Sequence, residues 1–106
     1  MAYNETQFQV LLTMLESNLD MDFTYMDAES RQQKETQLGY YLMASIEFIE
    51  REGITLNYDS IGDLLLVSMY AQFLYDKRFN GVSVMPRALR YNLNDRVFQE
   101  KVNNDG

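Results

Sequence analysis

The chain has no cysteine and no histidine among its 106 residues. The lack of cysteine excludes disulfides, thiolate nucleophiles and cysteine-ligated zinc sites. The lack of histidine removes both the commonest general base and the commonest metal ligand. We therefore expect neither an enzyme nor a protein that carries a metal or an organic cofactor.

The few patterns that resemble a chemical site are incomplete. No two of the five glycines have the spacing of a phosphate-binding loop or a dinucleotide-binding fingerprint. The stretch from Asp20 to Thr24 begins like a calcium loop, but that pattern then requires a glycine where Tyr25 stands and a glutamate where Arg31 stands. The sequence therefore predicts no phosphate, nucleotide or calcium site.

One pair of carboxylates, Glu47 and Glu50, lies three residues apart and would share a helix face. Such a pair does acid–base chemistry only when a cleft drives its two pKa values apart. On the outer face of an amphipathic helix both carboxylates are solvated, and we favour that interpretation.

Long apolar runs are also missing. The longest, Leu64 to Val67, is far too short to span a bilayer. The N-terminus has no basic segment followed by an apolar one, so we predict no signal peptide. The length suits one domain, which we place at residues 1–106, in a soluble protein that stays in the cytoplasm.

Acidic residues outnumber basic ones, and the net charge of -7 argues against free binding to nucleic acid. The charges are unevenly spread. Residues 1–63 hold twelve acids and three bases, whereas residues 64–106 hold four acids and six bases. A head-to-tail contact between copies could use this asymmetry. Alternatively, both charge sets solvate helix surfaces.

Proline occurs once and glycine five times, so the sequence predicts an all-α fold of long helices. We expect a small bundle of about four helices around a central apolar one, with a flexible C-terminal tail at residues 103–106. The hydrophobic spacing and capping signals place these helices at about Glu5 to Leu19, from Asp27 or Ser30 to Gly53, from about Ser60 to Phe79, and onward from Pro86.

The third helix is the predicted centre, because only Ser68, Gln72 and Asp76 form a polar stripe along it. Other core predictions follow from helical spacing and from the aromatic content of the first loop. They are Phe8, Leu11, Leu12, Leu15 and Leu19 in the first helix; Leu38, Leu42, Met43, Ile46, Phe48 and Ile49 in the second; Met69 and Tyr70 in the third; Leu89, Leu93 and Val97 in the fourth; and the aromatic residues of the loop between Asp20 and Asp27, which we expect to turn inward.

Protein-interface candidates come from two residue classes. Arg87 and Arg90 lie three residues apart at the start of the fourth helix, shortly after Lys77 and Arg78. They could form a patch for a partner's acids, pair with acids of the same chain, or contact DNA. Tyrosine is enriched where proteins meet, and the tyrosine candidates for an interface are Tyr40, Tyr58, Tyr75 and Tyr91.

Three segments together resemble the head-tail connector (adaptor or head-completion) proteins of tailed bacteriophages. Residues Leu38–Ile54 are similar to a connector helix in which an alanine is followed by an Ile-Glu pair and a terminal glycine. Residues Ile61–Arg78 resemble the family's central helix, which ends in a tyrosine and a basic residue. Met85–Tyr91 is similar to the proline-started C-terminal element of versions from prophages of Gram-positive bacteria.

This resemblance implies a structural virion protein that forms a ring beneath the portal, joins head to tail and extends the DNA channel. The implied partners are the portal protein, neighbouring copies in a dodecameric ring, and a stopper or tail protein. DNA would pass through an acidic channel without sequence-specific binding. The implied location is the virion neck, and the host cytoplasm during assembly.

A different class of function also fits the composition. A small acidic phage or bacterial protein can bind and inhibit a host protein, for instance by mimicking DNA. That alternative predicts a monomer or dimer with its carboxylates clustered on one face.

Overall fold

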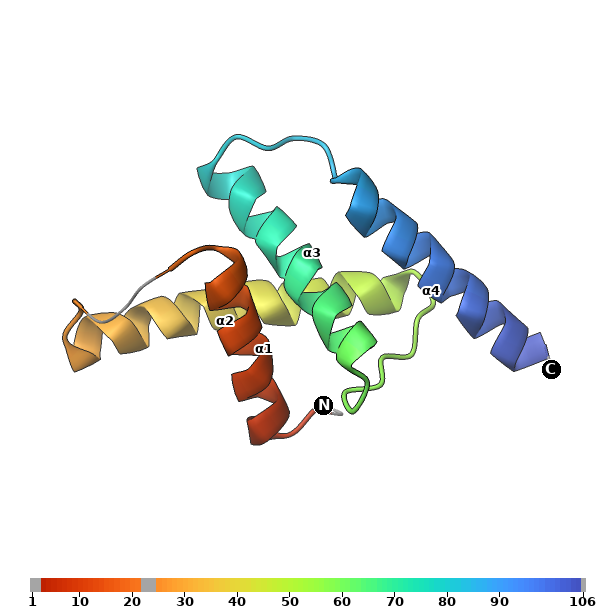
Figure 1. The fold of residues 1–106 in the computed structure, drawn as a ribbon, viewed down its shortest axis with the longest axis horizontal. Coiled ribbons are helices and arrows are strands. Elements are labelled where there is room, and N and C mark those ends of the chain that lie inside the picture. The colour runs from red at the N-terminus through yellow and green to blue at the C-terminus, as the bar shows by residue number, and fades with distance from the viewer. Residues whose placement is uncertain (1–2, 22–24, 106) are drawn as a thin grey trace.

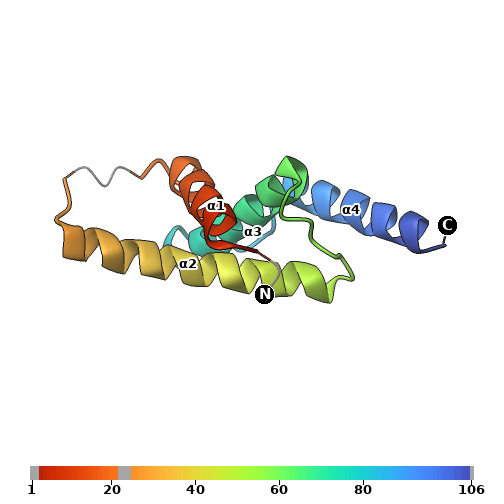
Figure 2. The same cartoon turned by 90° about the horizontal axis from the view of Figure 1, so that it is seen from below.

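In the computed structural model, which describes residues 3–21 and 25–105, the chain forms four α-helices and the predicted all-α fold is confirmed. Figure 1 shows α1, α3 and α4 from left to right with α2 crossing them, and Figure 2 shows α2 as a separate layer. The helices are α1 (Glu5–Asn18), α2 (Ala28–Arg51), α3 (Ile61–Phe79) and α4 (Arg87–Asp105).

Helices α1 and α2 begin and end where their capping residues predict. The Asn4 side chain accepts a hydrogen bond from the Gln7 backbone N–H at 2.8 Å, and Gln7 Oε1 accepts one from the Asn4 backbone N–H at 3.0 Å. Asp27 accepts the Ser30 backbone N–H at 2.7 Å at the start of α2. Past its other end, Gly53 has a φ of 93°, a conformation that favours glycine.

Helix α3 is the centre of the bundle, as predicted, because α1, α2 and α4 all pack against it. It begins after Ser60, whose hydroxyl accepts the Asp63 backbone N–H at 3.4 Å. Helix α1 crosses α2 closely at Gly39, where a Cβ atom would lie 3.1 Å from the Phe8 ring. The small residue therefore sets how near these two helices approach.

The core is formed by aliphatic side chains from all four helices and from the α2–α3 connector, where alternate residues turn inward. Burying these side chains supplies the main driving force for folding. The buried members are Leu11, Leu12, Leu15, Leu38, Leu42, Ile46, Ile49, Ile54, Leu56, Tyr58, Leu64, Leu66, Val67, Ala71, Phe73, Leu89 and Leu93.

Several core predictions are wrong or only partly right. Met43 and Phe48 are 43% and 39% exposed, although the Phe48 ring stacks on the Tyr70 ring of α3 at 6.0 Å. Phe8, Leu19, Met69 and Tyr70 pack against the core but are only partly buried.

The polar stripe of α3 has a structural role. Ser68 is fully buried, and its hydroxyl accepts a hydrogen bond from Asn18 Nδ2 at 3.3 Å. Gln72 Nε2 donates to the Asn18 backbone carbonyl at 3.4 Å. The stripe therefore holds the C-terminal end of α1, which satisfies polar groups that burial would otherwise penalise.

The first loop differs from the prediction that its aromatic residues turn inward. Tyr25 is 91% exposed and Met26 is 41% exposed. The other aromatic residue of this stretch, Phe23, lies outside the described residues. The described part of the loop thus adds no aromatic ring to the core.

Helix α4 continues to Asp105, so residues 103–105 form its last turn where the sequence predicts a tail. The predicted stripe is confirmed, with Leu89 and Leu93 buried and Val97 packed against the core. None of the helices formed by residues 3–21 and 25–105 is long and apolar enough to cross a membrane.

Candidate functional site

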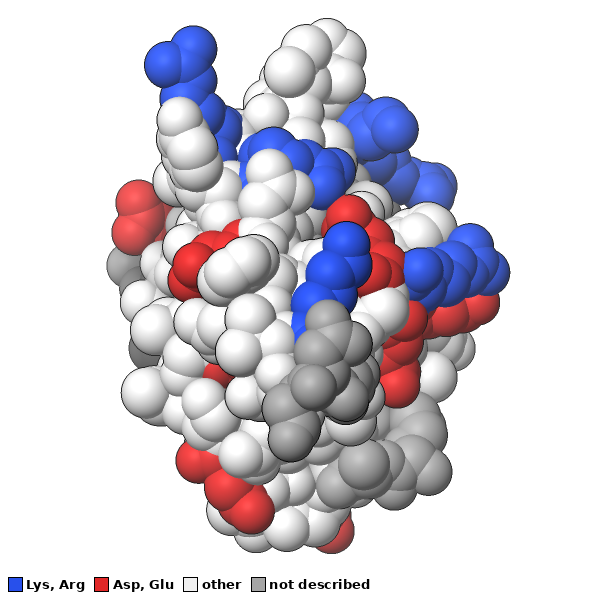
Figure 3. Space-filling view, turned by 90° about the vertical axis from the view of Figure 1, so that its right-hand side faces the viewer, with Lys and Arg blue, Asp and Glu red and all other residues white. Residues whose placement is uncertain are grey.

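Basic side chains gather at the end of α3 that leads into α4. Lys77 and Arg78 occupy the last turn of α3, Arg87 begins α4, and all three are exposed. None of the three forms an ion pair with another residue in the described part of the chain. Figure 3 shows one side of the molecule. The Lys and Arg side chains lie in the upper part of this view, and the charged side chains in its lowest part are acidic.

Arg90 forms an ion pair with an acid of the same chain, which is one of the alternatives left open by the sequence. Its Nη1 lies 3.0 Å from Glu52 Oε1, so it links α4 to the end of α2. Both side chains are partly exposed, and such a pair stabilises the fold only modestly.

The four candidate tyrosines fall into three environments. Tyr40 and Tyr91 are 65% and 68% exposed and are available to a partner. Tyr75 is half-buried, with its ring 4.7 Å from the Phe79 ring and Lys34 Nζ 5.4 Å from its centre. It therefore belongs to an aromatic cluster between α2 and α3.

Tyr58 is a core residue, which corrects its selection as an interface candidate. Only 8% of it is exposed, and its ring meets the Tyr3 ring edge-on at 5.5 Å. Burial, with a smaller effect of the Glu50 carboxylate, raises the pKa of Tyr58 to about 12. The alternation of the connector places it inward, and that signal was present in the sequence.

An exposed apolar stripe on the outer face of α4 was missed by the sequence reasoning. Tyr91, Phe98 and Val102 are 68%, 64% and 52% exposed. Their spacing of seven and four residues puts them on one side of the helix, opposite Leu89 and Leu93. The spacing was visible in the sequence, but it becomes informative only once α4 is known to extend past Val102.

A largely buried ionic cluster fixes α4 to α3 and was also missed. Arg96 Nε lies 2.9 Å from Asp63 Oδ1, and Nη2 lies 3.2 Å from Oδ2. Arg96 Nη2 also donates to the Thr55 carbonyl at 2.7 Å, and the Thr55 backbone N–H donates to Glu100. Every polar group of the cluster thus has a partner, as buried charges require.

The pKa values in this cluster follow from those contacts. Chiefly because Asp63 accepts its hydrogen bonds, the pKa of Arg96 is raised. The pKa of Glu100 is lowered, first by the hydrogen bond from the Thr55 backbone and then by Arg96. Both groups are held in their charged forms, so the cluster joins helices and is not poised to exchange protons.

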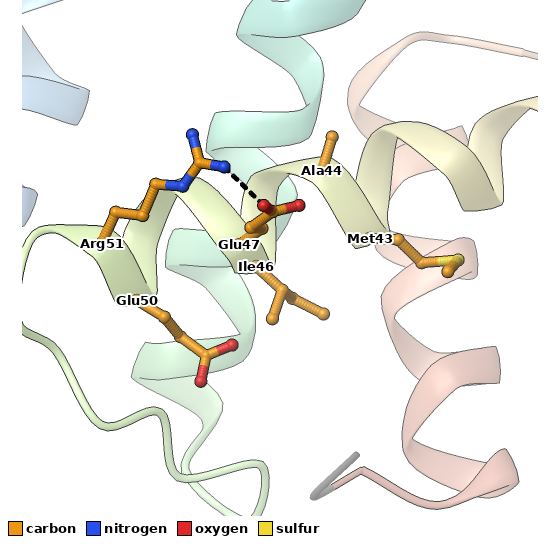
Figure 4. Close-up of a pocket in the computed structure, with 6 residues that line it drawn as sticks. All are labelled: Met43, Ala44, Ile46, Glu47, Glu50 and Arg51. Carbon is orange, nitrogen blue, oxygen red and sulfur yellow. Dashed lines mark hydrogen bonds and ion pairs between the residues drawn. The ribbon is translucent and has the colours of Figure 1, made fainter.

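The two carboxylates on α2 show no such arrangement. Figure 4 shows Glu47 directed toward Arg51, and the ion pair between them measures 2.6 Å. The side chains of both residues are about two-thirds exposed, and Glu50 is exposed as well. The groove that they line with Met43 is open to solvent, which favours the solvated interpretation over acid–base chemistry.

Acidic side chains lie at the opposite end of α3, around its first residue. Glu5 and Asp59 are exposed, and Asp59 Oδ1 accepts a hydrogen bond from Gln7 Nε2 at 2.8 Å. Ile61, the first residue of α3 and two positions after Asp59, is 62% exposed. The two ends of the central helix therefore carry opposite charges.

Within residues 3–21 and 25–105, no group of three acidic side chains is arranged to hold a metal ion. Comparisons of this chain with family models, with curated proteins and with solved structures found no match.

Proposed function

We propose that this chain is a structural connector of a tailed phage or prophage, which forms a ring beneath the portal, joins head to tail and extends the DNA channel. It acts in the virion neck after assembly in the host cytoplasm. It works by docking proteins together and carries out no catalysis.

The observation that carries the proposal is the presence of different exposed faces on one small domain. One end of α3 is basic, the other end is acidic, and the outer side of α4 is apolar. A subunit that repeats around a ring needs two unlike faces for its neighbours, because its contacts are heterologous. It needs a further face for the portal or the tail.

The helix order lends a second support. Residues Leu38–Arg51 of the connector-like segment lie in α2, and Ile61–Arg78 fills α3 almost completely. The proline-started segment leads directly into α4 after Pro86. The resemblance thus falls on the second part of α2, almost all of α3 and the start of α4, in the order that the connector family uses.

The outer stripe of α4 is the face that we assign to the portal. Phe98 and Val102 lie on the C-terminal half of α4, which projects at the edge of the molecule in Figure 1. Exposed aromatic and aliphatic side chains in a row are typical of a buried interface core. Lys101, exposed on the same helix, would meet acidic side chains of the portal at its rim.

The testing experiment is co-sedimentation of the purified protein with the portal protein of the same prophage, followed by electron microscopy. The proposal predicts an added ring of density coaxial with the portal. The double variant Phe98→Ser/Val102→Ser should lose this ring while its circular dichroism spectrum stays unchanged. Gln99→Ala, a change of an exposed residue on another side of α4, is the matched control and should retain the ring.

Two results would contradict the proposal. Absence of binding at every ratio of the two proteins would remove the connector function and leave the inhibitor of a host protein as the alternative. Loss of binding in the Gln99→Ala control as well would show that the outer stripe of α4 is not the portal face.

A further inference from the structure

We infer that a second copy of this chain docks on the two ends of α3, with the basic end of one copy against the acidic end of the next. The basic end comprises Lys77, Arg78, Phe79, Val84 and Arg87. The acidic end comprises Glu5, Asp59 and Ile61, and the hydrogen bond from Gln7 to Asp59 joins the starts of α1 and α3 there. This inference deepens the proposed function and rests on it for the ring that the contact would build.

The basic end combines positive charge with exposed apolar surface. Phe79 and Val84 are 47% and 76% exposed, and the Arg78 guanidinium lies 5.5 Å from the centre of the Phe79 ring. Lys34 Nζ lies 6.0 Å from the centre of the same Phe79 ring and adds a further positive charge. The nearest acid along α3, Asp76, accepts a hydrogen bond from Asn80 Nδ2 at 2.7 Å.

The acidic end has the same construction with the opposite sign. Glu5 and Asp59 are exposed and form no ion pair with a residue in the described ranges. Ile61 follows Asp59 by two positions and is 62% exposed. The nearby Asp63 does not add negative charge to the acidic end, because its carboxylate forms an ion pair with Arg96.

Charge complementarity identifies the partner as another copy. Each end offers a few like charges around one or two apolar side chains, so each provides what the other lacks. The ends lie at opposite termini of α3: in Figure 1 the acidic end is at the bottom of that helix and the basic end is at its top. They cannot meet within one molecule, and their contact between molecules is heterologous, which continues from copy to copy.

Nucleic acid is a poorer occupant of the basic end. The whole chain carries a net charge of -7, so the long-range field repels a phosphate backbone. The acidic end of a second copy presents carboxylates for the basic side chains and Ile61 for the exposed Phe79 and Val84. A phosphate backbone has no apolar group to contact Phe79 and Val84.

The test is sedimentation velocity of the purified full chain over a series of concentrations up to about 1 mM, where even weak association is measurable. We expect the average sedimentation coefficient to rise with concentration in low salt, and to rise less in high salt. Lys77→Glu reverses one charge at the basic end, and Asp59→Lys reverses one at the acidic end. Each variant alone should associate at least about five-fold more weakly.

Mixing the two variants supplies the decisive measurement. Each variant keeps one original end, so the original basic end of Asp59→Lys meets the original acidic end of Lys77→Glu, and the two reversed ends attract each other as well. Association should therefore return to within about two-fold of the original chain. The matched controls are Lys101→Glu and Glu29→Lys, which make the same charge changes at exposed positions outside both ends. They should associate like the original chain.

Failure of this inference is separable from failure of the proposed function. Absence of concentration-dependent association, equal effects of the controls, or no recovery on mixing overturns the contact. A ring on the portal would still support the connector function in that case. Recovery on mixing without any ring on the portal would support the contact and remove the function.

Discussion

The guanidinium of Arg96 on α4 contacts both carboxylate oxygens of Asp63 on α3, at 2.9 Å and 3.2 Å. The Asp63 carboxylate also accepts the Asn57 backbone N–H at 2.8 Å. This two-point contact ties α4 to the start of α3 and to the connector that precedes it. A charged pair with so little exposure stabilises the fold only while both partners are present.

Replacement of Arg96 by methionine should therefore destabilise the protein. The Asp63 carboxylate would stay enclosed without its counter-ion, which costs about 3–5 kcal/mol for fully buried pairs. Because the two side chains are 17% and 9% exposed, we expect the free energy of unfolding to fall by about 2–3 kcal/mol. Urea denaturation followed by circular dichroism measures this change. Arg87→Met, at an exposed residue without an ion pair in the described chain, should stay within about 0.5 kcal/mol. Equal losses in both variants would contradict the role given to Arg96.

Acid should weaken the same cluster through Glu100. Its pKa in the folded protein lies below the ordinary value of 4.5, because the charged carboxylate accepts the Thr55 backbone N–H. A lowered folded-state pKa contributes stability that is present above the ordinary value and is lost as the pH falls through the folded-state value. Unfolding free energies measured from neutral pH downward should fall in that acidic window. Glu100→Gln should flatten the fall, and an unchanged profile in this variant would exclude Glu100 as its source.

Much of the fold could be predicted from the sequence because its local signals agree. Asn4, Asp27 and Ser60 cap the helices that they were expected to cap, and Gly53 ends α2. These signals act within one turn of helix, so they need no knowledge of tertiary contacts. The end of α4 was missed because residues 101–105 carry no strong stop signal, and the helix continues to Asp105.

The titration of Tyr58 provides a test of the connector that precedes α3. Its pKa is raised to about 12 because burial disfavours the phenolate. A raised pKa of this kind contributes stability below pH 10, the ordinary value, and that stability is lost as the pH rises to about 12. Tyrosinate absorbance should show a late step, which Tyr58→Phe makes smaller; Tyr3 and Tyr70, whose pKa values burial also raises, contribute the rest of it. Tyr40→Phe, at an exposed ring, should leave that late step unchanged. A late step of undiminished size in Tyr58→Phe would contradict the burial of this residue.

The candidate site was less predictable than the fold because it depends on which residues from distant segments meet. Arg96 and Asp63 are separated by 33 positions, and nothing in the spacing of either one indicates the other. Lys77, Arg78 and Arg87 were found from their charge, and the structure places them at one end of α3. Tyr58 was predicted as an interface residue because tyrosine is common at interfaces. Its side chain is instead buried in the core, although it carries a polar hydroxyl.

Helix α4 should open more readily than α3, since it packs mainly against that one helix and the apolar side chains that it buries in the described chain are Leu89, Leu93 and part of Val97. Helices with few buried apolar contacts exchange their amide hydrogens through local openings of lower free energy. Native-state hydrogen exchange should show amides near Leu93 exchanging at least about ten-fold faster than those near Val67 in α3, a difference of about 1.4 kcal/mol. In Arg96→Met the α4 amides should lose more of their protection than the α3 amides, because the ionic cluster holds α4 in place. Uniform protection along both helices would mean that α3 and α4 unfold only together, and the cluster would then stabilise the whole domain equally.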